Sequence, residues 1–142
     1  QQQRLFQPQT QQETLKELRG HALHAMRAFA RFAPRLVGPV LDGTAAREQG
    51  VELLLFAETT EEVVLELLER GIPWQQTDGH FRYAGGTVRT HPVLAFVAGD
   101  IRVHLIVLPP RAVRNPPLGP VSERPERGIG ADELEQLIAA ES

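Results

Sequence analysis

Hydrophobic residues recur at intervals of three and four between residues 10 and 32, which is the period of a helix with one buried face. The recurring positions are Leu15, Leu18, Ala22, Met26, Phe29 and Ala33. Pro34 follows, and a residue that precedes proline avoids helical torsions, so the helix is expected to end there. Residues 1–10 are rich in glutamine and are expected to form a disordered segment.

Two short apolar runs come next. "RLVGPVL" (35–41) predicts a strand, and "VELLLFA" (51–57) predicts a stronger, central one because its apolar residues are nearly continuous. A loop of small and polar residues lies between them, with a helical turn expected over residues 44–49. Residues 59–71 predict a helix, because Thr59 and Glu62 fit a capping box and Gly71 fits a left-handed C-cap.

The second half of the chain has the pattern of an antiparallel meander. Asp78-Gly79 predicts a hairpin between residues 73–77 and 80–84, and Gly85-Gly86 predicts a further turn. Residues 87–97 and 101–108 predict two strands joined at Gly99-Asp100, and Pro92 indicates an edge or a bulge in the first of them.

The last part of the chain is rich in proline from residue 109 to residue 130, and a short helix is expected over residues 131–140. The sequence therefore predicts an α+β fold with a mixed sheet, flanking helices and an antiparallel meander. We expect one domain over residues 11–108, with the tail and the last helix (109–142) packing on it.

Composition narrows the functional classes. The 142 residues include no cysteine, which excludes disulfides, thiolate metal sites and cysteine nucleophiles. The net charge of −3 argues against general nucleic-acid binding. No apolar run is long enough for a membrane helix, and residues 1–12 lack the features of a signal peptide, so no membrane contact and a cytoplasmic location are expected.

The order of helix, strand ending at Gly38, small-residue loop and central strand resembles the nucleotidyltransferase fold of the DNA polymerase beta type, over roughly residues 20–110. "GPVLDGTA" (38–45) is similar to that family's Gly-Ser turn, and "GVELLLFA" (50–57) to the strand that carries two metal-binding carboxylates. "IRVHLIVLPP" (101–110) is similar to the strand that carries the third. The resemblance implies a turn that holds phosphate and carboxylates that hold two magnesium ions.

The chain departs from that pattern at each chemical position. Pro39 stands at the serine position and has neither a hydroxyl nor a backbone N–H. Glu52 is the single acidic residue of the second strand, and His104 stands at the third acidic position, where magnesium does not favour a nitrogen ligand. We therefore expect a non-catalytic protein with no metal site and no cofactor. Mg²⁺ is expected only under the alternative of an enzyme, for which the sequence identifies no catalytic residue.

Glu52 and His104 are expected to share a pocket, because the matching strands are neighbours in that fold. Across a two-residue turn His104 would face Ala95, and Arg102 would lie on the same face as His104. The candidate ligand-binding residues are Gly38, Asp42, Gly43, Thr44, Glu52, Arg102 and His104. Ordinary turn chemistry at residues 42–44, with Arg47 as a surface residue beside them, and a solvated histidine at residue 104 are the plain alternatives.

Other residues carry weaker signals. His21 and His24 share a helix face but have no third ligand at a telling distance, and His80 and His91 have no evident partner. Trp74 either stacks on a base or fills the edge of the sheet. The tail arginines are expected to be solvated and neutralised within the tail, where Glu123 and Glu126 interleave with them; these arginines are Arg111, Arg114, Arg124 and Arg127.

Three functions remain open. The first is a non-catalytic protein that binds a nucleotide-like or anionic ligand, or a protein partner such as a second copy. The second is a divergent nucleotidyltransferase that uses Glu52, Asp42 or Asp100 for metal. The third is an interaction module whose cleft is filled by Leu54, Phe56 and Ile106. The chain also resembles a proteobacterial family labelled UDP-N-acetylmuramate–alanine ligase, but it lacks the P-loop that such a ligase needs.

Overall fold

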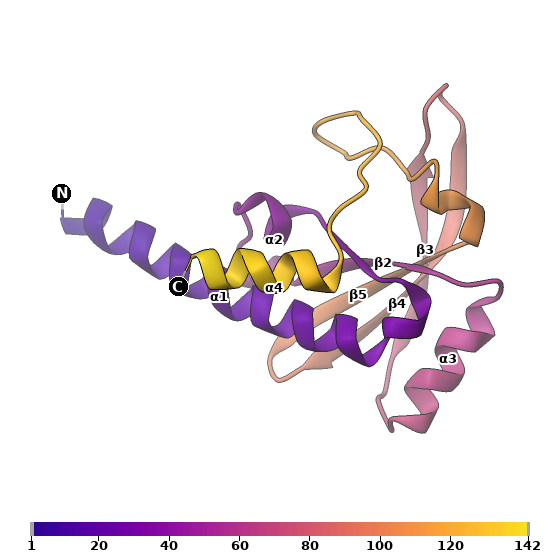
Figure 1. The fold of residues 1–142 in the computed structure, drawn as a ribbon, viewed down its shortest axis with the longest axis horizontal. Coiled ribbons are helices and arrows are strands. Elements are labelled where there is room, and N and C mark those ends of the chain that lie inside the picture. Colours follow the sequence, from indigo (N-terminus) through magenta and orange to yellow (C-terminus); the bar gives the residue numbers. More distant parts are fainter. Residues whose placement is uncertain (1, 142) are drawn as a thin grey trace.

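The computed structural model describes the backbone of residues 2–141 and the side chains from residue 11 onward. The helices are α1 (Gln2–Ala28), α2 (Pro39–Asp42), α3 (Thr60–Glu69) and α4 (Ala131–Ala140). The strands are β1 (Arg35–Val37), β2 (Val51–Phe56), β3 (Gln75–Arg82), β4 (Val88–Ala98) and β5 (Ile101–Leu108). Short 3₁₀ turns lie at Ala30–Phe32, Arg47–Gln49 and Pro110–Val113. The predicted α+β class is confirmed (Figure 1).

The five strands form one mixed sheet in the order β1-β2-β5-β4-β3. β2 pairs with β5 in parallel, and the other neighbouring strands are antiparallel. β2 therefore has a partner on each side, as its nearly continuous apolar sequence predicts. The position of β2 brings residues of the first half of the chain next to residues of the last strand.

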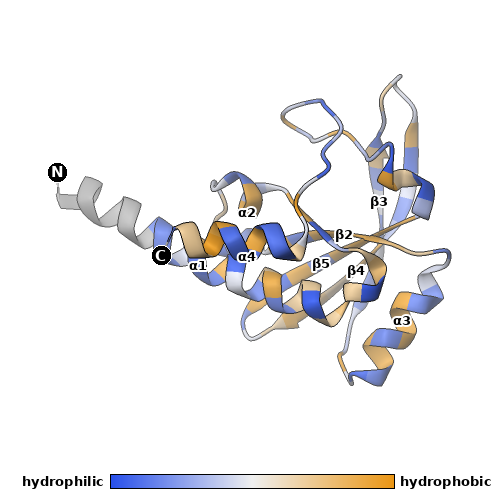
Figure 2. Cartoon of the chain, viewed as in Figure 1, coloured by the Kyte–Doolittle hydropathy of each residue, from blue (hydrophilic) through white to orange (hydrophobic). Residues whose placement is uncertain are grey.

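The two faces of the sheet pack against different material. One face carries the main core, formed with α1, α3 and α4, and the residues of β5 that enter it are Ile101, Val103, Leu105 and Val107. Figure 1 shows α1 and α4 running beside each other, and Figure 2 shows apolar and polar residues alternating around α3 and α4. The opposite face carries a smaller apolar cluster of Val37, Leu54, Ile106, Leu108 and Ala112. Beyond that cluster this face carries the candidates Glu52 and His104, which are half-buried, and Arg102, which is exposed.

The predicted hairpin at Asp78-Gly79 is wrong. β3 continues through both residues, with Gly79 paired to His91, and the turn lies at Gly85-Gly86, where φ is +90° and +89°. A Cβ on Gly79 would lie 2.7 Å from the ring of Phe81. Gly79 therefore makes room for a neighbouring ring within a strand, instead of supplying a turn.

Two proline positions refine the predicted strands. "RLVGPVL" forms a strand only as far as Val37, because Pro39 occupies the first turn of α2, where its missing N–H costs nothing. Pro92 lies in an interior strand, but the ladder between β4 and β5 begins only at Val93. At Pro92, β4 is therefore paired with β3 on one side and is not paired with β5 on the other.

The predicted ends of the helix over residues 59–71 are confirmed, but the first helix differs from its prediction, since α1 ends at Ala28 and a 3₁₀ turn at Ala30–Phe32 precedes Pro34. Thr59 and Glu62 form a capping box on α3, and Gly71 has a φ of +68°. The tail runs back over the sheet, where Ile129 bridges Leu36 of β1. α1 begins at Gln2, whereas disorder is predicted for residues 1–10; their side chains lie outside the described residues, and that expectation stays a prediction. Among the described residues, no helix has the length and apolar character needed to cross a membrane.

Candidate functional site

Gly38 forms the sharp turn between β1 and α2. Its φ of +80° is in the region that favours glycine, and its carbonyl accepts the amide N–H groups of Leu41 and Asp42 at 3.0 and 3.1 Å. A Cβ on Gly38 would lie 3.1 Å from Oε1 of Glu52. The turn therefore stands directly against a carboxyl group of β2.

A second carboxyl group meets the same turn from the other end of the chain. The amide N–H of Gly38 donates a hydrogen bond of 3.2 Å to Oε2 of Glu126. Glu52 is half-buried and makes no hydrogen bond or ion pair in the described part of the chain. Burial, and then the nearby charge of Glu126, raise the pKa of Glu52 above its ordinary value. The turn is thus flanked by two carboxyl groups, and burial together with the charge of Glu126 disfavours ionisation of Glu52.

Glu126 is the site residue that the sequence interpretation missed. The sequence predicts solvated tail arginines that Glu123 and Glu126 neutralise. The four arginines are exposed, but the predicted pairing with these two glutamates is wrong. Glu123 instead lies 3.7 Å from Arg82 of β3, and the Arg127 guanidinium donates to the carbonyls of Val113 and Arg114. The tail uses its charges to attach itself to other segments, and no local pattern around residue 126 indicates this.

Glu52 and Glu126 open into a small hollow of about 270 Å³. Most of its walls are apolar, and His80 and Arg82 lie at the β3 side; the apolar lining comprises Val37, Leu54, Phe81, Ile106, Pro117, Leu118 and Pro120. Leu54 and Ile106 are buried in the smaller apolar cluster. The hollow therefore offers carboxyl groups and apolar contacts, and it is narrower than the roughly 300–1,000 Å³ of ordinary small-molecule pockets.

His104 lies where the strand pairing predicts. It is the direct neighbour of Glu52 in the parallel ladder and the partner of Ala95 in the antiparallel one, so the predicted strand pairing is confirmed. The residues that line the hollow at Glu52 do not include His104, so the shared pocket stays a prediction. Burial, and then the charge of Arg102, lower the pKa of His104, which keeps the imidazole neutral at neutral pH. Arg102 is exposed and forms no ion pair with the described residues.

Arg102 lines a second, shallower hollow of about 410 Å³ on the open part of the sheet face. Ala95 and Val97 form its floor, and Trp74 and Gln75 stand beside it. Trp74 is half-buried and packs partly against the main core, which agrees with an indole that fills the sheet edge. The hollow combines an unpaired guanidinium with the accessible part of an aromatic ring.

Asp42, Gly43 and Thr44 do not join Glu52. This loop turns toward α1, where Nε2 of Gln11 donates to the Gly43 carbonyl at 3.4 Å. Arg19, which is only 4% exposed, donates to the carbonyls of Val40 and Leu41 at 3.0 Å each.

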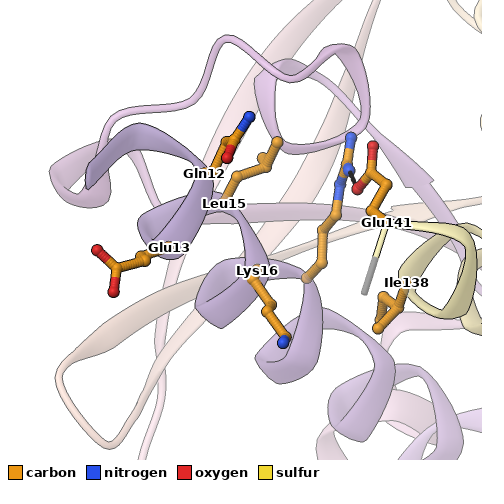
Figure 3. Close-up of a pocket in the computed structure, with 7 residues that line it drawn as sticks. Gln12, Glu13, Leu15, Lys16, Ile138 and Glu141 are labelled. Carbon is orange, nitrogen blue, oxygen red and sulfur yellow. Dashed lines mark hydrogen bonds and ion pairs between the residues drawn. The ribbon is translucent and has the colours of Figure 1, made fainter. Parts of the chain in front are cut away.

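Arg19 is also paired with Glu141 at the end of α4, which closes one side of the pocket between α1 and α4 (Figure 3). These contacts give the loop after α2 a structural role, in line with ordinary turn chemistry.

Asp100 is also separate from Glu52. It pairs with Arg47, which bridges to Glu17 of α1, and the Arg47 hydrogen bonds lower the pKa values of both carboxyl groups. Arg47 is a surface residue, as expected, with 40% of its side chain exposed, and it also bridges two carboxylates. Among the side chains that the structure describes, from residue 11 to residue 141, no three acidic or histidine groups are arranged to hold a metal ion. The three acidic residues that the sequence offers as metal ligands, Glu52, Asp42 and Asp100, thus do not come together at one site.

Comparison of this chain with protein-family models, with curated proteins and with solved structures found no match.

Proposed function

We propose that this chain is a non-catalytic binding protein on a nucleotidyltransferase-like scaffold. The observation that carries the proposal is the hydrogen bond from the Gly38 amide to Glu126. In the family that the chain resembles, the corresponding turn holds phosphate, whereas here a carboxylate of the same chain takes that donor. The order of α1, β1, α2, β2 and the neighbouring β5 supports the resemblance.

Electrostatics disfavour a triphosphate at this turn. A phosphate group at Gly38 has to displace Glu126 and then lie beside Glu52, since Glu52 Oε1 is 3.1 Å from the position of a Cβ on Gly38. Two like unit charges about 4 Å apart near a protein surface repel each other by roughly 4 kcal/mol. Pro39 supplies no N–H to offset that repulsion.

The binding surface of this proposal is the open part of the sheet face around Arg102 and His104. An unpaired guanidinium beside the ring of Trp74 suits a nucleotide-like or other planar anionic ligand, because charge and stacking act together. A protein partner or a second copy of the chain is the alternative occupant. A cytoplasmic location remains part of the proposal, in keeping with a sequence that contains no cysteine.

The experiment has two arms. Labelled nucleoside triphosphates with Mg²⁺ or Mn²⁺ are expected to give no pyrophosphate and no label transfer, and turnover that Glu52→Gln abolishes would overturn the non-catalytic proposal. Calorimetric titration with the same nucleotides is expected to give heat that Arg102→Met removes and that the exposed control Arg124→Met retains. Flat heats across all nucleotides would remove the ligand and leave a protein partner as the occupant.

A divergent metal-dependent nucleotidyltransferase is the second candidate. It is favoured by the meeting of Glu52 and Glu126, since two carboxyl groups are hard ligands of the kind that magnesium takes. Under this candidate Glu126→Gln and Glu52→Gln both abolish turnover. Under the proposed function the wild-type protein has no turnover, so neither substitution changes the result of the assay.

An interaction module with a vestigial cleft is the third candidate. It is favoured by the burial of Leu54 and Ile106 beneath Ala112, because apolar side chains then fill part of the cleft. Absence of both turnover and nucleotide heat, together with a stable complex with a protein partner, is the result this candidate requires.

A further inference from the structure

A separate hollow of about 220 Å³ lies beyond the turn that joins β3 and β4. One side is formed by Tyr83, the residue after β3, and by Arg89 and His91 of β4. The other side is formed by Arg111 and Asn115 of the tail. Its lining shares no residue with the hollow at Glu52. It is therefore a distinct place in the fold, and its chemistry is independent of the proposed function.

The charge of this hollow is positive. No aspartate or glutamate lines it, and neither Arg89 nor Arg111 forms an ion pair within the described residues. Other arginines of this chain do find carboxylates, namely Arg19, Arg27, Arg31, Arg35, Arg47, Arg70 and Arg82. Several exposed arginines also form no ion pair within the described residues, but Arg89 and Arg111 are brought together at one small hollow that no carboxylate lines.

The floor of the hollow is a buried hydrogen-bonded pair. The Tyr83 hydroxyl lies 2.7 Å from Nε2 of His91, and both side chains are 7% exposed. Burial, and then the charges of Arg89 and Arg111, lower the pKa of His91, so the imidazole is neutral at neutral pH. When the Tyr83 hydroxyl donates to Nε2, the imidazole proton lies on Nδ1. No described residue accepts a hydrogen bond from this N–H group.

The volume of the hollow and its hydrogen-bond donors indicate which kind of ligand it can bind. A volume of about 220 Å³ is below that of ordinary small-molecule pockets, so the hollow suits one charged group and not a whole nucleotide. Two guanidinium forks, the Asn115 amide and the Thr87 hydroxyl supply donors for several oxygen atoms at once. A tetrahedral dianion uses these donors more fully than a single carboxylate does.

We propose that the hollow formed by Tyr83, Arg89, His91 and Arg111 binds a phosphate group, either free or at the end of a small phosphomonoester. The guanidinium groups neutralise the two charges of the ligand, and the buried Tyr83–His91 pair fixes the floor against which its oxygen atoms rest. Arg89 comes from the sheet and Arg111 from the tail, so an occupied hollow also fastens the tail to the β3–β4 hairpin.

The test is calorimetric titration of the full chain with inorganic phosphate, glycerol phosphate and acetate at matched ionic strength. Arg89→Met and Arg111→Met are each expected to weaken phosphate binding by about tenfold or more, because each removes a charge-assisted hydrogen bond. Arg114→Met, which changes the same charge on the same segment outside the hollow, is expected to weaken it by less than about twofold. The imidazole resonances of His91, followed by NMR, are expected to shift with the same saturation curve.

The arms separate the two sources of phosphate. Binding of inorganic phosphate supports a free anion, and saturable binding of glycerol phosphate alone supports a monoester. No binding of either, binding that survives both arginine substitutions, or equal binding of acetate overturns the proposal. A cooperative thermal transition of Arg111→Met without phosphate that matches the wild type shows that the variant is folded. Loss of the phosphate-induced rise in melting temperature in that variant, with the rise kept in Arg114→Met, then identifies a lost site. None of these outcomes depends on the nucleotidyl-transfer assay, so this proposal and the proposed function can fail separately.

Discussion

Oε2 of Glu126 accepts a hydrogen bond of 3.2 Å from the amide N–H of Gly38, so a residue of the tail closes the turn after β1. The contact joins two positions that are far apart in the sequence. It also brings a carboxylate beside Glu52, whose carboxyl group stands against the same glycine. The turn is consequently held by a residue of the protein itself, and substitution of Glu126 tests this role.

Glu126→Ala should loosen the tail. The variant loses a charge-assisted hydrogen bond, so the free energy of unfolding is expected to fall by about 1–2 kcal/mol. Trypsin is expected to cut faster after Arg114, whose carbonyl accepts a hydrogen bond from the tail residue Arg127. Glu123→Ala is the matched control, because its 3.7 Å ion pair with Arg82 joins two exposed side chains and contributes less than about 1 kcal/mol. Equal proteolysis of the two variants would contradict the anchoring role.

Glu52→Gln should stabilise the protein in a pH-dependent way. Burial raises the pKa of Glu52 in the folded state, so the folded state binds this proton more tightly than the unfolded state does. The stability that this proton confers is complete below the unfolded-state pKa and is lost as the pH rises through the folded-state pKa.

Glutamine does not ionise, so the Glu52→Gln variant does not lose this stability as the pH rises. The variant is therefore expected to exceed the wild type by on the order of 1 kcal/mol near pH 7 and to gain little near pH 4, as urea unfolding would measure. A difference that is the same at both pH values would show that Glu52 is not responsible.

Arg19→Met should be strongly destabilising. Arg19 is 4% exposed and donates to the carbonyls of Val40 and Leu41, which lose their partner when the guanidinium is removed. The expected loss is about 2–4 kcal/mol in the free energy of unfolding. Arg27→Met removes an exposed pair with Glu135 and is expected to cost less than about 1 kcal/mol. Similar losses for the two variants would refute the structural role of Arg19.

Two glycines should respond in opposite directions to alanine. A Cβ on Gly20, within α1, meets nothing within 4 Å, so Gly20→Ala is expected to stabilise the protein by about 0.5–1 kcal/mol. Gly50 has a φ of +72°, and its Cβ would lie 2.2 Å from the backbone oxygen of Arg102, so Gly50→Ala is expected to cost about 2 kcal/mol or more. Thermal unfolding of both variants measures the contrast, and a stable Gly50→Ala variant would count against the β2–β5 geometry.

Much of the fold follows from local patterns. Alternation along β5 assigns Ile101, Val103, Leu105 and Val107 to the main core, and the two-residue turn at Gly99-Asp100 fixes the register that places His104 opposite Ala95. The pairing of Glu52 with His104 follows from the order of the strands. These features depend on periodicity and turn chemistry, which a sequence shows directly.

The rest depends on contacts between distant segments. Asp78-Gly79 has the composition of a turn, yet the ring of Phe81 packs where a side chain on Gly79 would be, and the strand continues. Glu126 lies in a proline-rich tail whose path no periodicity describes, so its meeting with Gly38 is visible only in three dimensions. The Tyr83–His91 pair likewise requires the β3–β4 turn to be placed correctly.

The most direct measurement of the closed turn is the amide resonance of Gly38 in a ¹H–¹⁵N NMR spectrum. Glu126→Gln is expected to move this resonance, because the substitution replaces the charged acceptor of its hydrogen bond. Titration of the wild-type protein with a nucleoside triphosphate and Mg²⁺ is expected to leave it in place, even where resonances near Arg102 respond. A saturable shift of the Gly38 amide in that titration would contradict the account, because the turn would then be holding phosphate.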